Sequence, residues 1–361
     1  MVEESNPHSY WRVRLHAVKD KLSRRGVREG RALSLLALVG RSALLIFLSA
    51  GSDLAISQRP GMDDLAAGTA SDDYGQLPID DSRRTALRRA VQAREYGHAE
   101  MLLVDEIKRQ PKSQVLLTTL GGVFFLDGKY LNCAVALKKA QALAPLPAHD
   151  DFTLALSYII LKHEDWARPE LEKLAASDPL NSLYPYWVGR IEYDAMNFEA
   201  AVSRFQKALS LRPSFMKAYD NLGLCYEALG RYDEAIGIYQ RAVLVNRSER
   251  LPSPWPPLNL GTLLVKLGRL DDAKPLLEES LQDSPRFPRA QYQMGLLLHK
   301  EKKDEEALHE LLEAARNDPS FPEPHYLLGQ IYTRRGEESK AESEWRIFQK
   351  LKQQSPNARP E

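Results

Sequence analysis

Cysteine is scarce in this chain of 361 residues, which contains only Cys133 and Cys225. Two cysteines cannot build a disulfide framework or a cysteine-based metal cluster, although a single bridge between them is left open by the sequence. An excess of either charge is also missing, since 49 Lys and Arg balance 49 Asp and Glu. Nucleic-acid binding needs a basic surface that neutralises phosphates, so the neutral composition argues against a nucleic-acid partner.

Catalytic motifs are missing as well. The sequence contains no GxxxxGK[ST] phosphate loop and no HExxH zinc motif, and it has no GxSxG nucleophile elbow. Acidic pairs such as Asp271 with Asp272 fall where helices are expected to begin, and carboxylates there favour the positive end of the helix dipole. We therefore expect no catalytic residue, no metal site, no cofactor and no small-molecule substrate, and predict that the protein is not an enzyme.

One long apolar run, residues 32–51, follows a basic leader and precedes a stretch rich in Asp, Gly, Ser and Pro. Twenty residues are enough for a helix to span the bilayer core, although Arg41 at the centre of the run opposes insertion by ~3 kcal/mol. The run is predicted to be a membrane anchor. Two alternatives stay open: residues 42–50 as the apolar region of a cleaved signal peptide, or a buried helix of a soluble domain.

The charge pattern also predicts an orientation and a domain plan. A basic flank stays in the cytoplasm, so the remaining chain is expected on the non-cytoplasmic side, either anchored by one N-terminal helix or exported after signal cleavage. The plan is a basic cytoplasmic leader (1–31), an anchor or signal segment (32–51), an acidic flexible linker (52–79), a folded body (80–355) and a disordered tail (356–361).

A repeat of 34 residues runs through the folded body. Its columns hold a small residue, then Ala or Cys twelve residues later, a large apolar residue four further on, and usually Pro. The small column is Gly121, Ala155, Gly189, Gly223, Gly261, Gly295 and Gly329. The large column is Leu137, Leu171, Phe205, Tyr239, Leu277, Leu311 and Trp345. The period breaks once, because Gly223 and Gly261 are 38 residues apart.

The clearest copy carries Tyr219, Gly223, Tyr226, Ala235 and Tyr239, and in these residues the chain resembles the tetratricopeptide repeat family. The resemblance implies an all-α fold, a right-handed superhelical solenoid of antiparallel helix hairpins. A proline ends most of the second helices. One hairpin cannot bury its apolar face alone, so the copies are expected to stack. The eight predicted copies are 80–113, 114–147, 148–181, 182–215, 216–249, 254–287, 288–321 and 322–355.

In this family the first helices line a concave groove that receives a peptide or a helix, and the resemblance implies the same use here. The predicted partner-binding residues are Phe125, Phe152, Tyr186, Trp187, Arg190, Asn221, Asn259, Arg289, Tyr292 and Gln293. The groove is predicted to be apolar and aromatic as far as Arg190 and polar beyond it. Aromatic and Arg side chains dominate interface hot spots, and Asn can bond both polar groups of a peptide unit.

The sequence therefore predicts a protein–protein interaction scaffold, tethered to a membrane, that binds a partner peptide or helix. The alternative is a non-catalytic accessory subunit of an envelope assembly, secretion or polysaccharide machine. Residues 251–257, with four prolines around Trp255, predict a stiff loop at the break in period. Trp255 is expected either to contact a partner or to fill the gap that the insertion leaves.

Overall fold

The structure is a computed structural model, and it describes residues 74–354 of the chain. The predicted leader (1–31), apolar run (32–51) and tail (356–361) lie outside the described residues, as does most of the predicted linker. Within the described part, no helix is both long and apolar enough to cross a bilayer. The anchor at 32–51 therefore stays a prediction.

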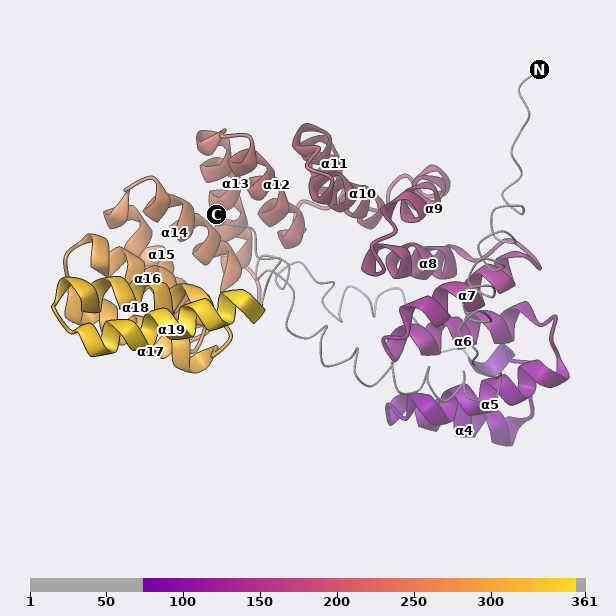
Figure 1. Cartoon of the computed structure of the whole chain (residues 1–361). Helices are drawn as coiled ribbons and strands as arrows, with labels where there is room; N and C mark the ends of the chain where they lie inside the picture. The colour runs from indigo at the N-terminus through magenta and orange to yellow at the C-terminus, as the bar shows by residue number, and fades with distance from the viewer. Residues whose placement is uncertain (1–73, 355–361) are drawn as a thin grey trace, which may run out of the picture. The chain divides into compact units, whose positions relative to one another are not determined.

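The described residues form sixteen α-helices and one short 3₁₀ turn, with no strand among them, which confirms the prediction of an all-α fold (Figure 1). The elements are η2 (Tyr74–Gln76), α4 (Asp81–Gln92), α5 (Tyr96–Arg109), α6 (Gln114–Leu126), α7 (Tyr130–Gln141), α8 (Ala148–Ile160), α9 (Glu164–Ser177), α10 (Leu183–Asp194), α11 (Phe198–Leu211), α12 (Met216–Ala228), α13 (Tyr232–Arg247), α14 (Trp255–Lys266), α15 (Leu270–Asp283), α16 (Pro288–Lys300), α17 (Asp304–Asn317), α18 (Pro322–Arg334) and α19 (Glu338–Gln354).

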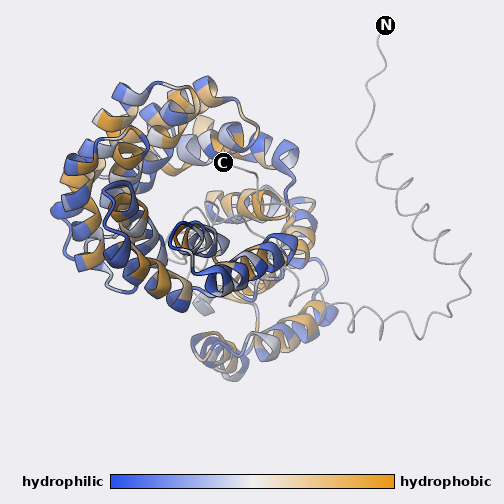
Figure 2. Cartoon of the chain, turned by 60° about the vertical axis from the view of Figure 1, so that its left-hand side comes forward, coloured by the Kyte–Doolittle hydropathy of each residue, from blue (hydrophilic) through white to orange (hydrophobic). Residues whose placement is uncertain are grey.

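Successive helices pair into hairpins, from α4 with α5 to α18 with α19. The helices divide into two compact units, one with α4 to α17 and one with α18 and α19. Within the larger unit, the second helix of each hairpin packs on the first helix of the next. Most helices carry hydrophobic and hydrophilic residues along their length, as Figure 2 shows. Such amphipathic helices bury their apolar stripes against neighbouring helices, which is the physical basis of stacking.

The small and large columns of the repeat meet inside each hairpin. A Cβ added to Gly121 would lie 2.7 Å from the Leu137 side chain, and one added to Gly189 would lie 2.8 Å from Phe205. The absence of a side chain on the first helix thus makes room for a large residue on the second. Six large-column residues are 0% exposed: Leu137, Leu171, Phe205, Tyr239, Leu277 and Leu311. The prediction that this column forms core is confirmed for these hairpins.

The turn inside each hairpin uses one residue with a left-handed backbone. Four of these positions are glycines with φ of 71° to 76°. The other four are Arg94, Lys162, Met196 and Lys302, with φ of 59° to 65°. A left-handed conformation is unfavourable for residues with a Cβ, so half of the turns are locally strained.

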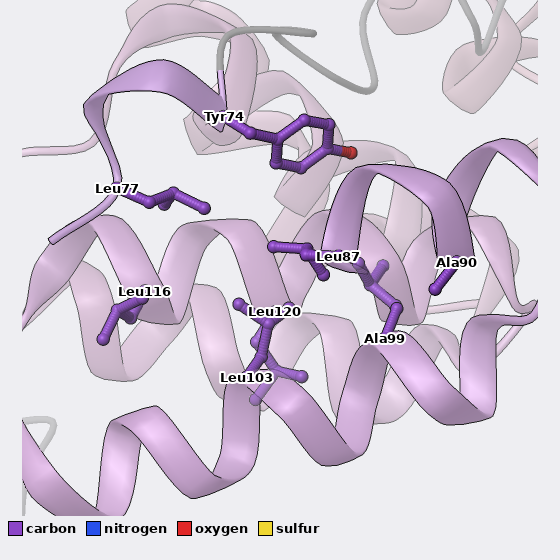
Figure 3. Close-up of a cluster of buried hydrophobic side chains, with 9 residues drawn as sticks. Tyr74, Leu77, Leu87, Ala90, Ala99, Leu103, Leu116 and Leu120 are labelled. Atoms are coloured by element: carbon purple, nitrogen blue, oxygen red, sulfur yellow. The ribbon is translucent and has the colours of Figure 1, made fainter. Parts of the chain in front are cut away.

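The flexible linker was predicted to reach residue 79, but residues 74–79 pack against the first hairpin. Tyr74 and Leu77 are 6% and 4% exposed and belong to the same apolar cluster as Leu87 (Figure 3). The Arg84 guanidinium donates to the carbonyl oxygens of Ile79 (2.8 Å) and Gly75 (3.0 Å). Burial of one aromatic ring and one leucine therefore fixes residues 74–79 against the hairpin, although the segment before them is polar in composition.

The break in period changes both neighbouring helices. Helix α13 has 16 residues, whereas α11 and α15 have 14, because Arg247 stands where most copies have the proline that ends the helix. The predicted stiff loop over 251–257 is wrong at its C-terminal end, since Trp255 already begins α14. The prolines at 256 and 257 fit there because the first N–H groups of a helix have no intrahelical acceptor to lose.

Candidate functional site: the first-helix face of α12, α14 and α16

Three consecutive first helices share a face of mostly polar side chains, which we call the first-helix face. Its residues on α12 are Lys217, Asp220 and Asn221; on α14 they are Trp255 and Asn259; on α16 they are Arg289, Tyr292 and Gln293. All are partly exposed except Asn221, which is 3% exposed. These residues occupy equivalent places in three 34-residue copies, so the repeat brings them to the same side of their helices.

Asp220 connects α12 to the following first helix. Its Oδ1 accepts a hydrogen bond of 3.2 Å from Nδ2 of Asn259 on α14. Burial raises the pKa of the Asp220 carboxyl to about 7, although the Asn259 bond and the charge of Lys217 both lower it. Loss of hydration thus outweighs the local stabilisation of the charged form, and a carboxyl that changes charge near neutral pH lies on this face.

Asn221 connects α12 to the preceding first helix. Its Nδ2 donates to the carbonyl oxygen of Lys217 at 2.7 Å and to the hydroxyl oxygen of Tyr186, on α10, at 3.4 Å. Its Oδ1 is buried and has no hydrogen-bond partner among the described residues. A buried acceptor without a donor is costly, so this atom is a candidate for contact with a bound group.

The far end of the face, on α14 and α16, is basic and aromatic. The Arg289 guanidinium lies 5.8 Å from the centre of the Trp255 ring. The Trp255 ring also packs edge-on against Phe287, with ring centres 4.9 Å apart. Trp255 therefore contacts the start of the next hairpin, which favours its predicted role in filling the gap. Its partly exposed ring and the Arg289 stack are both types of group that anchor protein interfaces.

The predicted aromatic half of the site has a different environment. The side chains of Phe125, Phe152, Tyr186 and Trp187 are 3–4% exposed. Phe152 packs edge-on against Tyr184 at 5.6 Å, and Tyr186 lies against Phe215 at 4.6 Å. Arg190 is also buried, at 8%. Partner binding by these five residues stays a prediction, and the accessible part of the predicted set lies on α14 and α16.

A pocket of about 460 Å³ lies away from this face, between α13, α14 and α15. Its lining includes apolar Val243, Leu260 and Leu264. Its charged lining residues are paired: Arg247 binds Glu279 at 2.5 Å, and Arg269 binds Asp272 at 2.8 Å. Because these lining charges are already paired within the chain, the described lining offers no unpaired charge to a ligand.

Two residues important to this region lie outside the predicted partner-binding set. Asp220 was not among the predicted partner-binding residues, although its place one residue before Asn221 is a signal that points to it. Asn246 was missed because its role depends on the connection after α13. Its side chain is 1% exposed, donates to the carbonyl oxygen of Ser253 (2.9 Å) and accepts from the Ser253 N–H (2.8 Å).

Stacked helical hairpins, each closed by a small residue against a large one, define an α-helical solenoid. The sequence model of the tetratricopeptide repeat matches residues 189–250 and 258–322. These two segments therefore match the tetratricopeptide repeat, as the columns predicted for them. No curated protein matches the sequence.

Solved structures support the same fold. The chain is similar to the APC/C hetero-tetramer Cut9–Hcn1, with a TM-score of 0.53 and 19% identity, covering 75% of this chain and 52% of that chain. It is also similar to PilF of Pseudomonas aeruginosa, with a TM-score of 0.50 and 21% identity, covering 62% of this chain and 99% of that chain. At this level of identity the likeness concerns the fold alone.

Proposed function

We propose that this protein is a non-catalytic scaffold that binds an extended segment of a partner protein along the first-helix face of α12, α14 and α16. The observation that carries the proposal is the row of accessible polar and aromatic groups at equivalent positions of three consecutive hairpins. A rigid array of this kind holds side chains at regular intervals, so an extended segment meets one hairpin after another.

Pull-down after chemical crosslinking tests this proposal on the full-length protein. The variant Asn259→Ala with Arg289→Ala removes one amide and one guanidinium from the face. The matched control, Gln240→Ala with Arg241→Ala, removes the same two groups from exposed positions of α13. We expect the first variant to lose partners that the control retains. Equal recovery of the same proteins by both variants would remove the first-helix face as the binding site.

We further propose that the apolar run 32–51 tethers the array to a membrane, with residues 80–355 on the non-cytoplasmic side. Support comes from the length of the run and from its basic N-terminal flank. Protease added to intact spheroplasts should degrade the array and spare a short N-terminal fragment. Protection of the array from protease would contradict this topology.

An accessory role in an envelope assembly, secretion or polysaccharide machine is the alternative form of the same proposal. A dedicated accessory subunit is expected to co-purify with one defined complex, whereas a general scaffold is expected to recover several unrelated partners. Mass spectrometry of the crosslinked material from the experiment above separates the two outcomes.

A further inference from the structure

Among residues 74–354, the Asp220 carboxyl at the acidic end of the first-helix face forms no ion pair, although the charge of Lys217 acts on it. Among the described residues, Lys217 is the cation whose charge acts on the Asp220 carboxyl, and burial still raises the pKa of that carboxyl to about 7. The other neighbours supply little positive charge: α14 contributes the neutral amide of Asn259. Helix α13 contributes Tyr239, whose own pKa is raised in part by Asp220. Within residues 74–354, the groups around the ionised carboxylate therefore do not offset the hydration that it loses on burial.

An amide acceptor accompanies this carboxylate on the same helix. Asn221 follows Asp220 directly, and its Nδ2 is used by the Lys217 carbonyl and the Tyr186 hydroxyl. The remaining atom, Oδ1, is buried without a donor among residues 74–354. The two adjacent side chains therefore provide a carboxylate without an ion-pair partner and an amide oxygen without a hydrogen-bond donor. A cationic hydrogen-bond donor would satisfy both groups.

The opposite end of the face has the opposite character. On α16, Arg289 of the face lies over Trp255, and the exposed Lys300, outside the face, ends the same helix. Repulsion between like charges disfavours a cation there. A bound segment consequently meets an acidic site on α12 and basic groups on α16, two hairpins further along.

We infer that Asp220 and Asn221 form a subsite for a cationic side chain, Lys or Arg, of the partner segment that the first-helix face binds. The inference rests on the proposed function and specifies which residue type the α12 end selects. An ammonium or guanidinium group carries several N–H donors. It binds the Asp220 carboxylate and donates to Asn221 Oδ1, while the Asn259 amide holds the carboxylate in place from α14.

Fluorescence anisotropy with defined peptide pools tests the subsite. Four pools of fluorescein-labelled heptapeptides, acetylated and amidated, carry Lys, Arg, Glu or Ala at the central position and equal mixtures of uncharged residues elsewhere. The full-length protein is expected to bind the Lys or Arg pool about fivefold more tightly than the Glu pool, the scale of a partly exposed ion pair. The Asp220→Asn variant, which keeps an acceptor for Asn259, should lose this preference.

Asp233→Asn serves as the matched control, because Asp233 is exposed on α13 and lies outside the face; it should bind the pools as the unmodified protein does. Equal binding of all four pools, or a cation preference that survives Asp220→Asn, would overturn the subsite while leaving peptide binding intact. Failure of every pool to bind would overturn both the subsite and peptide binding at this face.

Discussion

A Cβ atom on Gly223 would lie 2.2 Å from Cε1 of Tyr239. Tyr239 is completely buried, and its hydroxyl donates a 2.8 Å hydrogen bond to Glu227. The ring therefore cannot move aside without losing a buried contact. In the third hairpin the equivalent pair is Ala155 with Leu171, both 0% exposed. The size that the small residue can have thus depends on the large residue that it faces, sixteen positions later in the chain.

Substitution of Gly223 by Ala is therefore expected to lower stability by about 1–3 kcal/mol, the usual range for overpacking a core. Gly121→Ala is the comparison, since its added Cβ meets the flexible end of Leu137, and Ala155 facing Leu171 shows that such a pair fits. The double variant Gly223→Ala with Tyr239→Leu should recover part of the loss. Melting temperatures from circular dichroism measure these differences; equal shifts for Gly223→Ala and Gly121→Ala would contradict the steric account.

The strained turns predict stabilising substitutions. Lys162→Gly removes left-handed backbone strain, which stabilises the folded state by about 1–2 kcal/mol. It also raises the entropy of the unfolded chain, which lowers stability by about 0.4–1 kcal/mol. A net rise in stability of about 0.5–1 kcal/mol is expected from these two effects. The reverse change, Gly230→Ala at an equivalent turn with φ of 71°, should destabilise. Thermal melts that order the two variants the other way would exclude this account of the turns.

Asp220 predicts a pH-dependent contribution to folding. Its pKa of about 7 in the folded chain exceeds the value near 4 of an unfolded chain. The folded state therefore holds the proton more tightly, and the contribution of Asp220 to stability is fully present below about pH 4 and is lost as the pH rises through about 7. Partial exposure of Asp220 limits the effect to the order of 1–3 kcal/mol.

The measurement compares unmodified protein with Asp220→Asn in urea unfolding between pH 5 and pH 8. The variant should gain stability relative to the unmodified protein as the pH rises. A constant difference across this range would show that Asp220 has the same pKa in both states.

The connection after α13 depends on the Asn246 side chain. Asn246→Ala leaves the N–H and the carbonyl of Ser253 without the partners that they have at 2.8 and 2.9 Å. The expected loss of stability is about 1–3 kcal/mol, the range for unsatisfied buried polar groups. Glu249→Ala, at an exposed position of the same connection, should have little effect. Hydrogen exchange of residues 248–254 should accelerate in Asn246→Ala only; unchanged exchange there would exclude a fixing role.

Much of the fold could be predicted from the sequence because the same pair of contacting positions recurs in seven copies of the repeat. The small column predicts close helix approach, and Gly189 facing Phe205 shows the reason: removal of one side chain accommodates another. The proline column likewise predicts where second helices end, and α13 runs on through Arg247 where that proline is missing.

Features that occur once were harder to predict. Nothing in the periodicity distinguishes Tyr74 and Leu77 from linker residues, because their burial depends on a hairpin that follows them. The predicted site shows the same limit. Family positions identify residues on the first helices, but whether Trp187 is buried or Asn259 accessible depends on packing between particular hairpins.

The pairing of Gly223 with Tyr239 also bears on how such a chain changes by duplication. Both members of the pair lie in one hairpin. A duplicated or deleted segment of 34 residues therefore keeps them together if its ends fall between hairpins. Recombination at the turn near Gly230 would instead join one first helix to another second helix, for example Ala155 to Tyr239. Duplication of intact hairpins therefore preserves each small-to-large contact, whereas exchange of half-hairpins would place a Cβ against the Tyr239 ring.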